Sequence, residues 1–481
     1  MKGVWALVLA AWGASIGAAP GERPTSVRVD KLNANGNEAT LPETPASTRI
    51  GLYVATLDGR EIVAIRADER FVPASNTKLL TTAAAFETLP LGQPDDAGAE
   101  VRLERHDVIL AGHGDARLSS ADDCVSDCLA TLADAVAAKT RRVRHVVGDD
   151  SAFPDERWSP GMSWNNIATR SGTATSALTL DDNEAGYVVK PGGVPTIAGS
   201  GYYTVEPRVS IAAGPTRLVA ERLPGERRLR VVGTIAADAP PARLVTAIDD
   251  PAHHAAWRLA ALLRARGVRV TGEVQVRHRP LTPGDDPARR GGAPVMRPPP
   301  WTALARLVPP PLNEDLVGIN KQSQNLHAEL LLRRVGARAG SGSIADGLAV
   351  VAQVMTAAGV PRAAWDVADG SGMSSYNRVT PRAMVTLLRW AAERPWGARF
   401  RATLPIAGLD GTLRRRFIGT PLVGRLQAKT GTLHAANALA GFLTTQSGKT
   451  LVFAAYAADM PGDVSATAAI DAALIKIAAA H

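Results

Sequence analysis

The sequence predicts an α/β (α+β) fold in which helices surround an antiparallel sheet, and in which a β-rich insertion separates the two halves of that unit along the chain. Three observations predict it. Apolar strand patterns occur at both ends of the chain, over residues 49–66 and 438–457. Long stretches with apolar residues at helical spacing lie in the same two halves. Between them, residues 95–280 form short runs broken by Gly and Pro, which is typical of short strands.

The composition fits a globular, multi-domain protein. The 481 residues are 46% hydrophobic and 21% charged, which excludes a disordered chain, and the length favours two or three domains. Lys and Arg outnumber Asp and Glu by 54 to 46, giving a formal charge of +8, and nine of the 54 are Lys. The cations are dispersed without a long basic block, so we expect no nucleic-acid partner.

The first nineteen residues have the layout of a secretory signal peptide. One cation, Lys2, precedes a short apolar run over residues 4–12, and small residues follow up to Ala18 and Ala19. The run is too short for a membrane-spanning helix. We therefore expect cleavage beside Ala18 or Ala19 and export of the mature chain to the periplasm.

The N-terminal half of the split unit begins with a hairpin. Residues 49–56 and 61–66 alternate as strands, and Gly59 lies in the turn between them. A helix is predicted to open at residues 73–78 and to carry apolar residues at helical spacing up to Leu89. The expected catalytic unit covers residues 20–94 and 300–481. Residues 95–299 are expected to form the insertion, as two smaller β-rich domains.

Both cysteines lie in the insertion, four residues apart, before a predicted helix over residues 129–138. An exported protein meets an oxidising compartment, which favours a disulfide between Cys124 and Cys128. In a regular helix the Cβ atoms of such a pair would be about 5–6 Å apart, so the bond requires an irregular first turn. Two cysteines without nearby histidines are too few for zinc, and we expect no metal and no cofactor.

The C-terminal half is predicted to be rich in helices. A Pro- and Gly-rich linker covers residues 279–300, and helices are predicted over residues 323–337, 344–358, 381–393 and 464–480. Two strands, residues 438–444 and 450–457, are joined by a turn that contains Gly448.

The first motif with catalytic potential is Ser75-x-x-Lys78. It places a hydroxyl and an amine one helical turn apart on one face, at a helix start. If burial and neighbouring cations keep Lys78 neutral, the amine can take the proton of Ser75. The partial positive charge of the helix N-terminus would favour a developing oxyanion.

Two further motifs follow in the second half. Ser323-x-Asn325 has the spacing by which both side chains leave an extended turn in the same direction, offering a proton shuttle and an amide for the substrate backbone. Lys429-Thr430-Gly431-Thr432 leads into an edge-like strand, where Gly431 permits close approach. A substrate could pair there as an added strand, with cationic and hydroxyl groups holding its carboxylate.

Each motif alone has an ordinary structural interpretation as part of a helix or turn, and only their order along the chain is informative. This trio of motifs is found in penicillin-binding proteins and class A β-lactamases.

The chain resembles the class C penicillin-binding proteins, the D-alanyl-D-alanine carboxypeptidases/endopeptidases of peptidase family S13. Besides the three motifs, the segments that match this family's pattern are residues 112–118, 176–183, 369–381, 404–413 and 428–433. The long insertion between the first and second motifs is also the family's arrangement, and a β-lactamase would lack it. The resemblance implies a split penicillin-binding/β-lactamase-like serine transferase domain.

The resemblance also implies a mechanism. A D-Ala-D-Ala peptide would acylate Ser75 and release D-Ala, and water would then release the acyl group. Lys78 would be the general base, with Ser323 and Lys429 relaying the proton. Backbone N–H groups of Ser75 and Thr432 would form the oxyanion hole.

Binding roles follow from the same resemblance. Asn325 would hold the substrate amide, and Thr430 with Thr432 the terminal carboxylate. The implied partners are peptidoglycan stem peptides, with β-lactam antibiotics as inhibitors and at most a peripheral association with the cell wall or membrane. One departure concerns Asn166, which lies in a segment where family members often carry an acidic residue.

Two competing hypotheses remain at this stage. One is another serine hydrolase on the same scaffold, a β-lactamase or an esterase. The other is a non-catalytic cell-wall-binding protein, which is disfavoured because all three motifs are intact.

Overall fold

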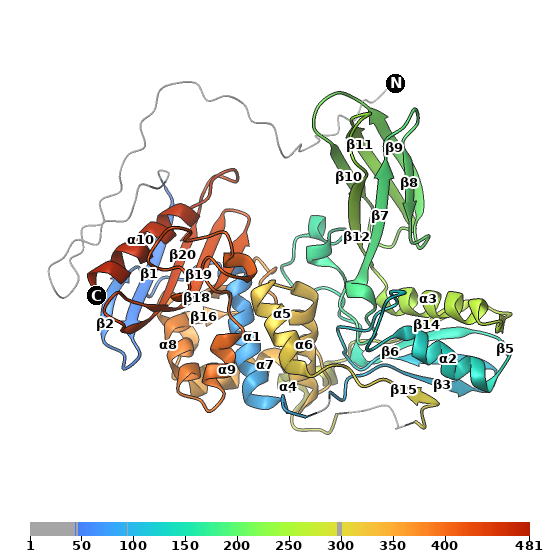
Figure 1. Cartoon of the computed structure of the whole chain (residues 1–481). Coiled ribbons are helices and arrows are strands. Elements are labelled where there is room, and N and C mark those ends of the chain that lie inside the picture. Colours follow the sequence, from blue (N-terminus) through green and yellow to red (C-terminus); the bar gives the residue numbers. More distant parts are fainter. Residues whose placement is uncertain (1–43, 45–46, 94, 296–300) are drawn as a thin grey trace, which may run out of the picture.

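The computed structural model describes residue 44 and residues 47–93, 95–295 and 301–481. The expected signal peptide, residues 1–19, lies outside the described residues. The unit expected to be catalytic, called the catalytic half below, is built on an antiparallel five-stranded sheet in the order β18-β19-β20-β1-β2. Its strands are β1 (Arg49–Thr56), β2 (Glu61–Ile65), β18 (Leu426–Leu433), β19 (Ala436–Thr444) and β20 (Thr450–Ala458). The first and last parts of the chain therefore share one sheet, as predicted (Figure 1).

Helices cover both faces of this sheet. One layer comprises α1 (Thr77–Thr88), α5 (Leu312–Lys321), α6 (Asn325–Ala337), α7 (Ile344–Ala357), α8 (Pro381–Ala392) and α9 (Gly397–Ala402). The other face is covered by α10 (Thr467–Ala480), whose Ile470 and Leu474 pack against the sheet. Successive strand residues point to opposite faces, so Tyr53 joins the first core and Leu52 the second.

The insertion begins with a mixed sheet in the order β14-β6-β4-β3-β15. These strands are β3 (Glu100–Glu104), β4 (Asp107–Ala111), β6 (Val146–Pro154), β14 (Val274–Arg279) and β15 (Ala305–Arg306). Helices α2 (Leu129–Lys139) and α3 (Pro251–Ala265) share an apolar core with it. Strand β15 follows residue 300 yet pairs with β3, so the chain passes once more through this sheet before it enters the catalytic helices.

The rest of the insertion is an outer β unit that projects from this mixed sheet (Figure 1). It contains two three-stranded sheets, β12-β7-β8 and β10-β11-β9, which share one apolar core. Their strands are β7 (Glu184–Lys190), β8 (Thr196–Gly199), β9 (Thr204–Ile211), β10 (Arg217–Glu221), β11 (Arg228–Ile235) and β12 (Ala242–Ala247).

The cysteines form the predicted disulfide, with 5.8 Å between the Cα atoms of Cys124 and Cys128. The required irregularity is present, because Asp127 has a φ of 56° and Cys128 is extended at the N-cap of α2. The bond closes the loop that precedes α2.

The predicted helices and strands are confirmed, with small shifts at their ends. The largest shift at the functional motifs concerns α6, which begins at Asn325 and not at residue 323. Ser323 has a φ of 63°, a left-handed conformation that cannot belong to an α-helix.

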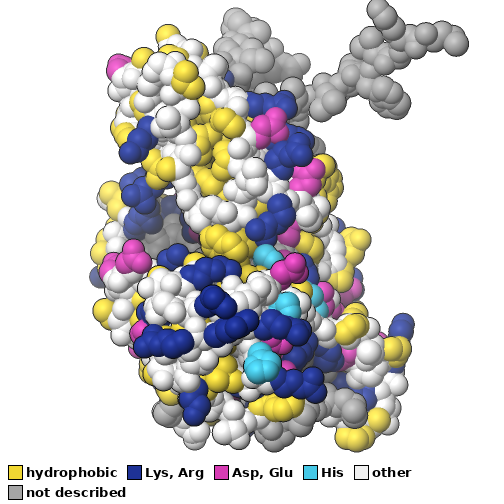
Figure 2. Space-filling view, turned by 90° about the vertical axis from the view of Figure 1, so that its right-hand side faces the viewer, with side chains coloured by type: hydrophobic (Ala, Val, Ile, Leu, Met, Phe, Trp, Pro, Cys, Tyr) yellow, Lys and Arg dark blue, Asp and Glu magenta, His cyan; other side chains and the backbone are white. Residues whose placement is uncertain are grey.

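The insertion carries a basic surface below the outer β unit (Figure 2). Here β5 (Arg142–Val143) pairs in parallel with β13 (Arg269–Val270), next to the C-terminal ends of α2 and α3. We define the basic end as seven exposed cations around these elements: Arg105, Lys139, Arg141, Arg142, Arg144, Arg264 and Arg269. Within the described residues only Arg144 of the seven forms an ion pair, with Asp107 at 3.7 Å.

Candidate active site

The first catalytic motif lies where α1 begins. Ala74–Asn76 form a 3₁₀ turn that continues directly into α1, so Ser75 and Lys78 lie on one face. Lys78 Nζ lies 3.0 Å from Ser75 Oγ. Lys78 is fully buried and Ser75 is half-buried. The pair therefore combines an accessible hydroxyl with a desolvated amine.

Two acceptors from the second half of the chain complete the environment of Lys78. Its ammonium group donates to Asn325 Oδ1 at 2.6 Å and to the carbonyl of Ser371 at 2.6 Å. Asn325 is the first residue of α6, and its Nδ2 donates to the carbonyl of Ser171 in the insertion at 2.9 Å. The second motif therefore contacts the first directly.

Lys429 forms the second buried amine of the site. Its Nζ donates to Ser323 Oγ at 2.8 Å and to the Thr430 carbonyl at 3.0 Å. The left-handed backbone of Ser323 turns the chain between α5 and α6. Such strain in a non-glycine residue is maintained at functional sites by the structure around it.

Strand β18 and the start of α1 are joined by backbone and side-chain contacts. Asn76 Nδ2 donates to the Lys429 carbonyl at 2.8 Å within the core. Gly431 lies so close to this turn that a Cβ atom there would be 2.7 Å from the Pro73 carbonyl. A side chain at residue 431 would separate β18 from Ser75, so the glycine is required by close approach.

The carboxylate-binding residues expected from the third motif lie along β18, at the edge of the sheet. Thr430 Oγ1 lies 2.7 Å from Thr412 Oγ1, Gly431 is buried and Thr432 is exposed. On its other side β18 is bonded by residues 405–407 over residues 426–428, so within the described sheet the edge left to accept an added strand begins at Lys429.

The two lysines have strongly perturbed pKa values. Burial lowers the pKa of Lys78 to about 7, although the charges of Asp369 and Glu329 act to raise it. Burial, together with the nearby charge of Lys78, lowers the pKa of Lys429 well below its ordinary value. Lys78 therefore becomes available as a proton acceptor near neutral pH, and Lys429 gives up its proton more readily than an ordinary lysine.

Two buried carboxylates lie behind Lys78. Burial and the charge of Glu329 raise the pKa of Asp369 to about 6. Asp369 accepts from the backbone N–H groups of Gly372 and Ser374, at 3.0 and 2.7 Å, and so shapes the loop that presents the Ser371 carbonyl. No cluster of three or more His, Cys, Asp or Glu side chains in the described chain is arranged as a metal site.

Most of the chain matches the sequence model of one peptidase family. Residues 36–481 match the model of the D-Ala-D-Ala carboxypeptidase 3 (S13) family. The chain belongs to this family. The D-alanyl-D-alanine carboxypeptidase of Actinomadura sp. (strain R39) is 33% identical over 430 residues, which are 83% of this chain and 75% of that relative. The D-alanyl-D-alanine carboxypeptidase DacB of Haemophilus influenzae is 25% identical over 440 residues, 87% and 88% of the two chains.

Two solved structures have a fold similar to that of this chain. The crystal structure of penicillin binding protein 4 (dacB) from Haemophilus influenzae has a TM-score of 0.73 and 23% identity, covering 91% of this chain and 96% of its own. A second structure of that protein, complexed with a novel beta-lactam, has a TM-score of 0.67 and 22% identity, over 90% and 95% of the chains. The predicted S13 carboxypeptidase identity and fold class are thereby confirmed.

All the residues predicted for the S13 site lie together. Ser75, Lys78 and Asn325 are in direct contact, Ser323 contacts Lys429, and Thr430, Gly431 and Thr432 extend along the same strand. Their catalytic roles remain predictions. Asn166 lies on a 3₁₀ turn of the insertion, Trp164–Asn166, and its side chain has no hydrogen bond within the described structure.

Sequence reasoning missed four residues that position the S13 site: Asn76, Glu329, Asp369 and Thr412. The signal for Glu329 was available, since it follows Asn325 by one helical turn on α6. Asp369 belonged to a matched segment but received no role. Nothing in the sequence connects Asn76 or Thr412 with β18.

Proposed function

We propose that the chain hydrolyses the terminal D-Ala–D-Ala peptide bond of peptidoglycan stem peptides through an acyl-enzyme on Ser75. The observation that carries this proposal is the half-buried Ser75 hydroxyl, hydrogen-bonded to a buried lysine whose pKa is lowered to about 7. Membership of the S13 carboxypeptidase family supports the substrate class.

In the acylation step, Ser75 Oγ attacks the carbonyl carbon of the penultimate D-Ala, and its proton passes to neutral Lys78. The oxyanion is stabilised by the backbone N–H groups of Ser75 and Thr432. The C–N bond then breaks, and the leaving amine takes a proton supplied through Ser323 and Lys429. Water finally attacks the ester, returning the proton to Ser75 and releasing the shortened peptide.

Substrate binding uses the edge strand. The peptide would pair with β18 from Lys429 onward, beyond the stretch that residues 405–407 already cover, as an added strand whose side chains alternate between the site and solvent. Asn325 would hold the substrate amide in exchange for its present contact with the Ser171 carbonyl, and Thr430 with Thr432 would bind the terminal carboxylate.

A fluorescent penicillin tests the nucleophile, since a β-lactam acylates the same hydroxyl by ring opening. Ser75→Ala should abolish labelling and leave the free energy of unfolding within about 1 kcal/mol of the unchanged protein. Ser126→Ala, which alters an exposed serine of the insertion, should label normally. Normal labelling of the Ser75→Ala protein would overturn the mechanism.

Defined muropeptides distinguish the reactions available to this site. Mass analysis of the products should show loss of D-Ala from pentapeptide stems, and cleavage of cross-linked dimers would add endopeptidase activity. Rapid turnover of penicillin, in place of a long-lived acyl-enzyme, would instead favour a β-lactamase.

We propose that this chemistry takes place outside the cytoplasm, at the cell wall. No helix of the described chain is long and apolar enough to cross a membrane. The signal-like residues 1–19 support export to the periplasm. The basic end of the insertion supports a peripheral, electrostatic association with the anionic wall.

A further inference from the structure

Glu329 holds the peptide that contacts the proposed base. It lies on α6, is 9% exposed, and directs Oε1 at the backbone N–H groups of Gly370 and Ser371, at 3.1 and 2.9 Å. The carbonyl of the same Ser371 accepts from Lys78 Nζ at 2.6 Å. Glu329 and Lys78 therefore hold one short backbone segment from two sides.

The second carboxylate oxygen of Glu329 faces the insertion. Ser159 Oγ donates to Oε2 at 2.9 Å, and Arg333 Nη1 lies 3.3 Å from the same oxygen. Ser159 belongs to the insertion, whereas Arg333 lies on α6 with Glu329. The same side chain thus connects the insertion with the loop behind Lys78.

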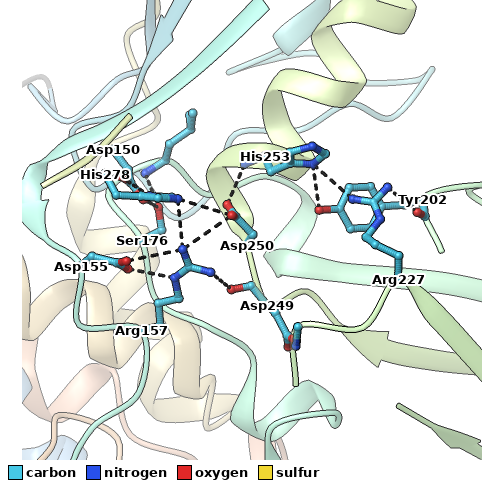
Figure 3. A network of polar contacts seen from close by, with 12 residues as sticks. Asp150, Asp155, Arg157, Ser176, Tyr202, Arg227, Asp249, Asp250, His253 and His278 are labelled. Atoms are coloured by element: carbon cyan, nitrogen blue, oxygen red, sulfur yellow. Dashed lines mark hydrogen bonds and ion pairs between the residues drawn. The ribbon is translucent and has the colours of Figure 1, made fainter. Parts of the chain in front are cut away.

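The segment that carries Ser159 is anchored by charges (Figure 3). Arg157, two residues earlier, pairs with Asp155 at 2.9 Å and Asp250 at 3.5 Å, and it donates to the Asp249 carbonyl at 2.8 Å. His278 contacts Asp150 at 2.9 Å and Asp250 at 3.4 Å.

This network joins β6, β14 and the start of α3. Hydrogen bonds to Asp150 and Asp250 raise the pKa of His278 to about 10, so it is a cation at neutral pH. Through Arg157, this network ties the segment two residues before Ser159 to Asp249 and Asp250, which precede α3.

The charges around Lys78 are few. The buried groups that act on it are Asp369 and Glu329, which raise its pKa, and its own charge in turn lowers the pKa of Lys429. Arg333 neutralises part of the Glu329 charge from α6. Removing the charge of Glu329 therefore acts directly on the pKa of Lys78.

We propose that Glu329 is a positioning residue that links the insertion to Lys78, with Ser159 as the contact through which the insertion acts. Glu329 fixes the Ser371 carbonyl against Lys78 and supplies one of the two negative charges beside it. This proposal rests on the assignment of Lys78 as general base for Ser75.

The test is the pH dependence of the acylation rate constant, measured with a fluorescent penicillin on the full chain from pH 5 to 9. Because neutral Lys78 is the reactive form, the rate of the unchanged protein should rise with pH and reach half its maximum near pH 7. Glu329→Gln keeps the size and an acceptor but removes the charge, so the pKa of Lys78 falls.

The half-maximum of Glu329→Gln should therefore move to lower pH, by about half a unit or more. The shift is partly offset by Asp369. Without the Glu329 charge the pKa of Asp369 also falls, so Asp369 stays ionised and continues to raise the pKa of Lys78. If the half-maximum of Glu329→Gln stayed at the pH of the original protein, the proposal would be overturned. A purely structural residue would lower the plateau of the acylation rate without moving the pH of the half-maximum.

Ser159→Ala tests the contact from the insertion without touching Glu329. Its plateau rate should fall about threefold to tenfold, because the Ser371 carbonyl is held less firmly. Ser375→Ala is the matched control, since Ser375 Oγ donates to the Gly161 carbonyl of the insertion at 2.9 Å but does not contact Glu329.

The rate of Ser375→Ala should stay within about twofold of the original. If Ser159→Ala behaved like this control, the link to the insertion would be refuted even if Glu329→Gln did not fold. Failure of the underlying function is distinguished by Ser75→Ala, whose continued labelling would contradict the nucleophile but not the contacts of Glu329.

Discussion

Lys78 and Lys429 are the two buried lysines of the described chain, and they have different neighbours. Lys78 has two carboxylates behind it, whereas the only charge that acts strongly on Lys429 is Lys78 itself. The positive charge of Lys78 therefore opposes protonation of Lys429, whereas the two carboxylates favour protonation of Lys78. With its pKa lowered, Lys429 is suited to exchange a proton with Ser323, whose Oγ lies 2.8 Å from Lys429 Nζ.

The roles proposed for the two lysines depend on their burial, which the sequence could predict only in part. The spacing of Ser75 and Lys78 correctly predicted their contact, because both lie at one helix start. Burial lowers the pKa of Lys78, and its hydrogen-bond partners Asn325 and Ser371 lie 247 and 293 residues further along the chain. Local patterns carry no information about such contacts.

Gly372 provides a test of how tightly the loop behind Lys78 fits. Its φ is 89°, and a Cβ atom there would lie 1.9 Å from the Ala74 carbonyl, next to Ser75. Gly372→Ala should lower the free energy of unfolding by about 3 kcal/mol and slow acylation, because the loop must move away from Ser75. Denaturant unfolding and penicillin labelling measure the two effects.

Gly359→Ala is the control for backbone strain alone. Gly359 also has a positive φ, 75°, but nothing lies within 4 Å of the added Cβ. This variant should lose about 1 kcal/mol and keep its acylation rate. Equal losses of stability in the two variants would show that close contact with Ala74 is unimportant.

At the scale of elements, the site is assembled where three segments meet: the start of α1, the turn between α5 and α6, and β18. The sequence predicted α1 and α6, because apolar periodicity and Gly, Pro and Asn positions are local, but it did not predict α5. It predicted that the third motif leads into an edge-like strand, whereas Lys429–Thr432 lie within the edge strand β18 itself. The predicted start of α6 was wrong by two residues, because the left-handed conformation of Ser323 has no strong sequence signal.

The disulfide-bonded loop before α2 should stabilise the insertion without affecting chemistry. Closing a loop this short contributes about 2 kcal/mol to the free energy of unfolding, by restricting the unfolded chain. Replacing Cys124 and Cys128 together by Ser should remove that amount in denaturant unfolding, and penicillin acylation of the folded protein should be unchanged.

Reductant provides the control for this variant. It should destabilise the original protein by the same amount and leave the double variant unaffected. A slower acylation by the folded double variant would contradict the separation of this loop from the site.

At the scale of the whole molecule, catalytic residues and basic surface belong to different parts of the chain. The reactive groups lie between the catalytic helices and the five-stranded sheet, and the basic end lies at the β5–β13 ends of the insertion. The net charge of +8 and the dispersal of the cations along the sequence did not reveal this clustering. The clustering arises because α2, α3 and two short strands end at the same place.

The basic end should govern binding to isolated cell walls. Replacing Arg141, Arg142 and Arg269 together by Glu should weaken binding to purified sacculi about tenfold or more at low salt, while penicillin acylation stays unchanged. Binding of the original protein should itself weaken as ionic strength rises. Co-sedimentation over a salt series measures both effects.

A matched triple variant separates local charge from net charge. Arg60, Lys449 and Lys476 are exposed cations of the catalytic half, and their replacement by Glu changes the total charge equally. This variant should bind walls nearly as well as the original. If both triple variants bound equally weakly, net charge and not the basic end would be responsible.

The pairing of β1 with β20 has a consequence for how the protein reaches this structure. Thr56 pairs with Leu451, so the central strand pair of the catalytic sheet closes a loop that contains most of the chain. The entropy of closing a loop of that length opposes the pairing by about 5 kcal/mol. The insertion's helices and sheets can form within that loop and shorten its effective length. Folding of the catalytic sheet should therefore be the late, slow event, completed only when the last strands of the chain are available.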